Sequence, residues 1–132
     1  PVSDICMDDS VLFLWTTFPQ LKDAFRAIES WGFVYKTCGF VWVKTNNCGS
    51  LFMGLGRYTR SNAEICLIAK RGKGVPRKSA SVLNVQLSQR LRHSEKPKIF
   101  RELIAELFGE VSRVELFARK RVDGWDSWGN EV

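Results

Sequence analysis

The stretch that decides the fold is VLFLWTTFPQLKDAFRAIESWGFVYKTCGFVWV, residues 11–43. Residues 11–16 are mostly apolar and are suited to a strand that is buried on both faces. Across 21–31 the apolar side chains recur at helical spacing, with a proline near the start and a glycine after the end. Aromatic and β-branched residues at 33–35 and 40–43 predict two more strands. Strand, helix, strand is the unit of a parallel sheet with a crossover helix, so an α/β fold is expected.

The rest of the chain continues this alternation of loops, strands and a helix. Asparagines and glycines make 46–61 a turn-rich loop, and an apolar strand is expected at 65–69. Residues 71–92 show no convincing period and are expected to form a second long loop. Apolar residues on one side of 97–108 predict an amphipathic helix, and a further strand is expected from Val114. No repeat, low-complexity tract or internal boundary is visible.

Composition limits the class of protein. At 132 residues the chain is expected to form a single domain, 1–132, or most of one. An apolar fraction of 45% is typical of a globular chain. No apolar run approaches the roughly 20 residues of a membrane span, and the acidic start lacks the basic and apolar leader of a secreted protein. We therefore expect a cytoplasmic protein without membrane association.

The cysteines do not predict a metal site. No two of the four form a C-x-x-C pair, and His93 is the only histidine. Cys38 and Cys66 lie in or beside strand-like apolar runs and are expected to be reduced thiols of the core.

The charge balance indicates a polyanionic partner. The net charge is +6 and the pI is near 9.4, which favours nucleic acid but is also common in proteins that do not bind it. Basic residues cluster in one short segment that contains glycine and proline, although an ordinary solvated loop would look the same. The basic residues of this segment are Lys70, Arg71, Lys73, Arg77 and Lys78.

The last residues, ELFARKRVDGWDSWGNEV at 115–132, place charged and amide groups directly after an apolar strand. An open α/β sheet uses this arrangement to hold a nucleotide-like ligand. The same pattern also fits a strand end followed by a solvated basic loop.

The residue identities in this segment are more specific than its pattern of apolar and charged positions. ELFAR followed by W-x-x-W-G-N-E resembles the C-terminal signature of the adenine-specific (6-amino) methyltransferases, the MT-A70 family. Further motifs of the same resemblance follow one another in the same order along the chain. They are VLFLWTT from Val11, WGFVYKT from Trp31, VWVKTN from Val41, GLGRYTRSNAE from Gly54 and HSEKP from His93.

The resemblance implies a Rossmann-like methyltransferase fold, with a mostly parallel sheet flanked by helices and incomplete at its N-terminus. It implies transfer of a methyl group from S-adenosylmethionine to the 6-amino group of adenine in nucleic acid, with DNA favoured over RNA. A homodimer or heterodimer is also compatible with the family.

The resemblance also carries over a set of site residues. Around the cofactor it implies Lys96, Glu115, Phe117, Arg119, Arg121, Asn130 and Glu131. Arg119 and Asn130 are expected to reach the ribose, and Glu131 to border the cofactor adenine. Near the target base it implies Glu64, Ser94 and, again, Lys96. The loop that holds Arg121 is shorter than in some relatives, which leaves the register of Arg121 open.

Two basic loops are further candidates for substrate contact. In GLGRYTR, Arg57 and Arg60 are expected to meet phosphate and Tyr58 to stack on a base. This is not a dinucleotide fingerprint, because the third glycine is missing. Contact with nucleic acid is also expected from Lys73, Arg77 and Lys78.

Each candidate residue has a simpler alternative. Glu64 and Lys96 could form a surface ion pair worth less than ~1 kcal/mol. Phe117, Trp125 and Trp128 could be core aromatics, which is our preferred interpretation of the two tryptophans. Ser94 could serve only as a helix cap and Asn130 as a turn residue.

One motif of the family is absent. An Asp-Pro-Pro-Trp tetrapeptide, which accepts hydrogen bonds from the target amine in the family, does not occur in this chain. It would precede Pro1, so we expect a chain cut downstream of it and assign no catalytic residue here. The alternatives are an inactive relative that binds nucleic acid or supports a partner subunit, and a generic basic nucleotide-binding protein.

Overall fold

A computed structural model describes residues 2–92 and 95–129 of the chain. The chain divides into two units, one made of Pro1–Pro76 with Ser81–Arg90 and the other of Arg77–Ala80 with Leu91–Val132. Each unit has its own sheet, and each is described by itself below. In the described part of the chain, no helix is long and apolar enough to cross a membrane.

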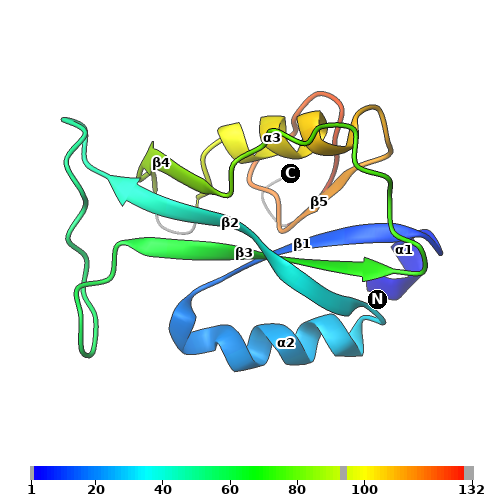
Figure 1. Cartoon of the computed structure of the whole chain (residues 1–132), viewed down its shortest axis with the longest axis horizontal. Helices are drawn as coiled ribbons and strands as arrows, with labels where there is room; N and C mark the ends of the chain where they lie inside the picture. The colour runs from blue at the N-terminus through cyan, green and yellow to red at the C-terminus, as the bar shows by residue number, and fades with distance from the viewer. Residues whose placement is uncertain (1, 93–94, 130–132) are drawn as a thin grey trace. The chain divides into compact units, whose positions relative to one another are not determined.

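The first unit contains a four-stranded sheet in the order β1-β3-β2-β4 (Figure 1). The strands are β1 (Ser10–Thr16), β2 (Val34–Thr45), β3 (Ala63–Arg71) and β4 (Val85–Gln89). β3 pairs antiparallel with both β1 and β2, whereas β4 pairs parallel with β2. The expectation of a mostly parallel sheet is therefore met only in part. Three strands run in one direction, but the sheet is mixed and two of its three ladders are antiparallel.

The direction of β3 follows from the segment that precedes it. The helix α2 (Leu21–Ser30) does carry the chain from β1 to a parallel β2, as predicted, but the two strands are not neighbours. After β2 the chain turns back at once, where the amides of Asn46 and Gly49 bond to the carbonyls of Ser50 and Asn46. No crossover helix intervenes, so β3 returns antiparallel and lies between β1 and β2.

Helix α2 packs on one face of this sheet and forms the core of the unit. Ala24 and Ile28 of α2 are buried against Ile65, Leu67 and Ala69 of β3. Burial of each larger side chain, such as Ile28 or Leu67, contributes about 1.5–3 kcal/mol to the stability of the fold. The short helix α1 (Val2–Ile5) precedes β1, and the 3-10 helix η1 (Phe18–Gln20) leads into α2.

Two sequence-based boundaries differ in this unit. The strands expected at 33–35 and 40–43 are one strand, β2, with register irregularities at Tyr35/Thr37 and Cys38/Phe40. Gly39 lies at the second irregularity, where a Cβ would come within 2.5 Å of the Ile68 side chain. Strand β4 falls inside 71–92, which was expected to be loop. The strand was not predicted because five residues that alternate in polarity at the edge of a sheet give little periodic signal.

The second unit contains a helix and a two-stranded sheet. Helix α3 (Ile99–Phe108) confirms the amphipathic helix expected at 97–108, and Gly109 ends it with a positive φ of 74°. The strand β5 (Val114–Leu116) begins where expected and pairs parallel with β6 (Asp126–Trp128), a strand that the sequence pattern did not predict.

Candidate functional site

Strand β5, which pairs with β6, and the residues that directly follow β5 hold three of the predicted cofactor residues, Glu115, Phe117 and Arg119. The strands are parallel, with Glu115 opposite Ser127 and Leu116 opposite Trp128, so both carboxyl ends reach the same edge. Beyond the strands, the amide of Ala118 donates to the carbonyl of Trp128 at 3.0 Å. A Cβ on Gly129 would lie 2.7 Å from the Ala118 nitrogen, so only glycine permits this approach of the two chains.

Phe117 is held in an unusual conformation at this edge. Its φ of 56° is in the left-handed region, which costs a non-glycine residue roughly 1–2 kcal/mol. The ring is 73% exposed and packs edge-on against Trp128, with ring centroids 5.5 Å apart. Trp128 is itself 59% exposed, so the interpretation of Phe117 and Trp128 as core aromatics is wrong. Trp125 is half-buried, and the Arg113 guanidinium lies 5.5 Å from its ring centroid.

Glu115 has a structural partner. Its carboxylate forms an ion pair with the guanidinium of Arg101 on α3, at 3.2 Å. Both side chains are largely shielded from solvent, at 17% exposure for Arg101 and 30% for Glu115. The pair joins β5 to α3, which is a sufficient reason for an acid at this position.

Arg119 lies between β5 and β6 in sequence, and Lys96, a further predicted cofactor residue, lies before α3. Arg119 is half-buried and directly follows the buried Ala118. Lys96 is half-buried just before the buried Pro97 and α3. Neither side chain is without an interaction partner. Ser94, Asn130 and Glu131 lie outside the described residues.

In the first unit, Glu64 forms an ion pair with a residue that the sequence analysis did not consider. The Nζ of Lys44 on β2 lies 2.7 Å from the Glu64 carboxylate on β3. The same Nζ lies 5.1 Å from the ring centroid of Trp42, and the Glu64 side chain is only 12% exposed. Glu64 is thus a largely buried, paired acid beside an aromatic ring.

The segment between β2 and β3 forms an arm that extends past the end of the sheet (Figure 1). Arg60 closes the arm, because its Nε donates to the carbonyl of Gly54 at 2.6 Å. Arg57 is exposed and Tyr58 is 96% exposed. Arg57 and Tyr58 are therefore accessible to a ligand, whereas Arg60 already has a structural role.

The structure divides the predicted basic loop between the two units. Lys73 belongs to the first unit, where its backbone amide donates to the Asp9 carboxylate at 2.8 Å. Arg77 and Lys78 belong to the second, where the Lys78 amide donates to the carbonyl of Leu107 at 2.7 Å. All three side chains are exposed. The backbone of the loop is therefore held at Asp9 just before β1 and at Leu107 of α3.

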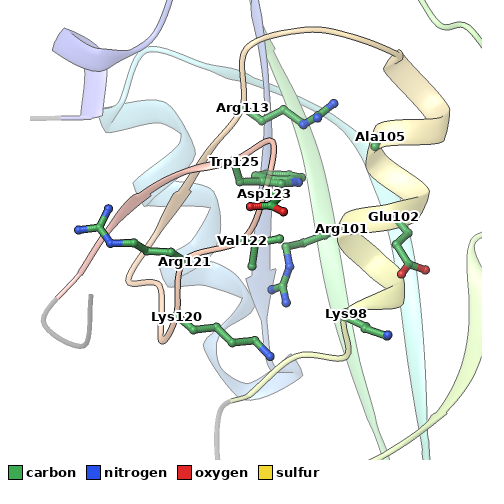
Figure 2. A pocket seen from close by; sticks show the side chains of 10 residues that line it. All are labelled: Lys98, Arg101, Glu102, Ala105, Arg113, Lys120, Arg121, Val122, Asp123 and Trp125. Carbon is green, nitrogen blue, oxygen red and sulfur yellow. The ribbon is translucent and has the colours of Figure 1, made fainter.

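A cavity of 410 Å³ in the second unit was not anticipated (Figure 2). Among the predicted site residues, Arg121 is the one that lines it. Its basic residues are spread over positions 98–121, and no sequence motif groups them. It is lined by Lys98, Arg101, Glu102, Ala105, Arg113, Lys120, Arg121, Val122, Asp123 and Trp125.

The cysteines are free, as expected for reduced thiols. Cys66 is buried, and burial raises the pKa of Cys38 above its ordinary value. Burial also raises the pKa of Cys6, against a smaller opposing effect of the Arg71 charge. Cys48 differs, because hydrogen bonds to Ser50 lower the pKa of this exposed thiol. Within the described ranges, no three His, Cys, Asp or Glu side chains gather as metal ligands.

Comparisons with known proteins agree over almost the whole chain. The family model described as MT-A70 matches residues 1–131. The type II methyltransferase M.MunI of a Mycoplasma species is 42% identical over 132 residues, covering 99% of this chain and 54% of that relative. The N6-methyladenosine RNA methyltransferase MTA1 of Cryphonectria parasitica is 30% identical over 138 residues, covering 100% of this chain and 40% of that relative. The chain thus spans about half the length, or less, of these curated relatives.

Proposed function

This chain belongs to the MT-A70 family, and from that membership we propose that its protein transfers a methyl group from S-adenosylmethionine to the 6-amino group of adenine in nucleic acid. The observation that carries the proposal is the family match over residues 1–131, which extends across both units. We favour DNA over RNA, because identity to the bacterial type II methyltransferase, at 42%, exceeds the 30% identity to the RNA methyltransferase.

The described edge of β5 and β6 has features that suit a nucleoside cofactor. An exposed aromatic pair, Phe117 and Trp128, offers ring surface, and Phe117 is strained into the position it holds. The Oγ of Ser127 on β6 is buried without a hydrogen-bond partner in the described part of the chain. Strain and an unsatisfied polar atom are both features that concentrate at ligand sites.

We assign the cofactor to this edge, with Arg119 and Asn130 on its ribose and Glu131 beside its adenine. Phe117 and Glu115 belong to the same segment, and Lys96 lies between cofactor and target adenine in this proposal. When bound, S-adenosylmethionine supplies an electrophilic methyl group. The protein residues would position the ligands in line, which is the larger part of what such a reaction requires.

For the target base we propose Glu64 and Ser94, with Arg57 and Tyr58 of the arm on the nucleic acid. The exposed Tyr58 can stack on a base without sequence preference. If the substrate is a duplex, the adenine must leave the stack before it can react. No residue of this chain is assigned to accept protons from the target amine, because Asp-Pro-Pro-Trp does not occur in it.

The test is direct detection of the product. The full-length protein is incubated with S-adenosylmethionine and an adenine-containing DNA duplex or the matching RNA. The nucleic acid is then digested to nucleosides for mass spectrometry. We expect N6-methyladenine, with more in DNA than in RNA. Methylation at another atom, or none in either substrate, would refute the proposal.

A second candidate is a catalytically inactive relative that binds nucleic acid or supports an active partner subunit. Asp-Pro-Pro-Trp does not occur in residues 1–132, so its presence elsewhere in the protein separates the two candidates. The complete reading frame discriminates between the two. Asp-Pro-Pro-Trp upstream supports the enzyme, whereas an intact upstream region without the tetrapeptide supports the binding protein.

A further inference from the structure

The cavity of the second unit has a basic lining that the proposed cofactor site does not use. Five of its ten lining residues are basic and two are acidic. They come from α3 and its N-cap Lys98, from the segment before β5 and from the loop between β5 and β6. The cavity is an open depression with a volume of 410 Å³, so it is accessible from solvent.

Most of this positive charge is not neutralised. Arg101 is paired with Glu115, but its Nε is buried and has no hydrogen-bond partner in the residues described. For Lys98 and Lys120, none of the described carboxylates lies within ion-pair distance. Five basic against two acidic residues give the wall a net positive charge, which favours an anionic ligand.

Arg113 is fixed in place without losing its charge. Its Nη1 donates to the carbonyl of Gly109 at 3.0 Å and its Nε to that of Gly124 at 3.2 Å. Both acceptors are neutral carbonyls. The guanidinium also lies over the ring of Trp125, which adds to its rigidity. Arg113 is therefore a pre-oriented cation in the cavity wall.

The cations lie at two ends of the cavity. In Figure 2 the charged groups of Lys98, Arg101 and Lys120 point toward one end, and Arg113 lies at the other. Val122, Trp125 and the carboxylate of Asp123 lie between them, and Arg121 extends outward. Two separated groups of cations suit an extended chain of anions better than a single small anion.

We propose that this cavity binds consecutive phosphodiester groups of the nucleic acid on which the protein acts. The inference rests on the proposed function and adds the place where the backbone is held. Guanidinium groups match phosphate geometry, and contacts of this kind fix the register of a protein on nucleic acid without reading its sequence.

The test compares two variants that lose the same charge. Lys98→Gln/Lys120→Gln removes two cations of the cavity. Lys22→Gln/Lys36→Gln removes two exposed lysines of the first unit that lie outside it. Binding of a fluorescein-labelled DNA duplex to the full chain is measured across salt concentrations, and S-adenosylmethionine affinity is measured in parallel. Thermal unfolding confirms that both variants fold.

Each lost phosphate contact should lower the slope of log affinity against log salt by about 0.9. The cavity variant should therefore lose about two units of slope and bind the duplex roughly tenfold more weakly at moderate salt. The control should change less than twofold, and cofactor affinity should change in neither. Equal losses in the two variants would overturn the inference and leave the proposed function standing.

Two other outcomes would also overturn it. Weaker cofactor binding by the cavity variant, with unchanged duplex binding, would assign the cavity to the cofactor. Displacement of the duplex by poly-glutamate at equal charge concentration would indicate an acidic protein partner. If the unmodified protein binds S-adenosylmethionine but no nucleic acid, both the cavity inference and the assigned substrate class fail.

Discussion

At the scale of single residues, a substitution at Phe117 tests whether its strained backbone conformation contributes to ligand binding. Glycine at this position would relieve the cost of the positive φ, about 1–2 kcal/mol, and would lose the ring pair with Trp128, about 0.5–1.5 kcal/mol. We expect Phe117→Gly to change the free energy of unfolding by less than about 1 kcal/mol. Cofactor affinity should nevertheless fall about tenfold in a calorimetric titration. A fall in stability with unchanged affinity would make Phe117 purely structural.

At the same scale, substitutions of Glu64 distinguish a structural role of its ion pair from a role in methyl transfer. Glu64→Ala leaves Lys44 largely buried without its carboxylate, and such a loss costs about 1–3 kcal/mol. Glu64→Gln keeps a hydrogen-bond acceptor and should lower the free energy of unfolding in urea by less than Glu64→Ala does. If Glu64 also contacts the target base, Glu64→Gln should reduce methyl transfer much more than it reduces stability. Parallel losses of both would indicate only a structural pair.

Cysteine reactivity should follow the pKa directions. A lowered pKa gives Cys48 more thiolate at a given pH, whereas the raised pKa values of Cys6 and Cys38 give them less. Iodoacetamide near pH 7.5 should therefore modify Cys48 first, as peptide mass spectrometry can measure. Ser50→Ala removes the side-chain hydrogen bond, which is the largest cause of the lowered pKa, and should slow modification at Cys48 alone. First modification of Cys38 would contradict this account.

At the scale of secondary-structure elements, the sequence predicted what periodicity and apolar runs control. α2, α3, β1 and β3 were expected close to their observed bounds. The direction of β3 was not, because it depends on the immediate reversal at Asn46 and not on the strand itself. β6 was not predicted, because Trp128 was interpreted as a core aromatic, whereas it is exposed at the edge of the two-stranded sheet.

The junction of β5 and β6 depends on Gly129. Alanine would place Cβ 2.7 Å from the nitrogen and 2.8 Å from the oxygen of Ala118, so the two strand ends would have to separate. We expect Gly129→Ala to destabilise the protein by about 1–3 kcal/mol and to weaken cofactor binding. Ser112→Ala, an exposed change in the same unit, is the control. Unchanged thermal unfolding in Gly129→Ala would show that the junction can move freely.

At the scale of the whole molecule, the sequence motifs predicted the family, and the family model confirms it over residues 1–131. The cofactor residues remain predictions, since side-chain position depends on packing that motifs do not encode. Glu115 and Glu64 illustrate this, because each has an ion-pair partner that no motif indicated. The basic cavity likewise arises from two segments, 98–105 and 113–125, whose side chains the fold brings together.

The central claim is that residues at the carboxyl ends of β5 and β6 bind the ribose of S-adenosylmethionine. The most direct measurement is calorimetric titration of S-adenosylmethionine into the full-length protein and into its Arg119→Ala, Asn130→Ala and Lys22→Gln variants. We expect one equivalent to bind, at least tenfold more weakly to Arg119→Ala and Asn130→Ala, with unfolding midpoints and Lys22→Gln affinity unchanged. Equal affinity in all four proteins would contradict the claim.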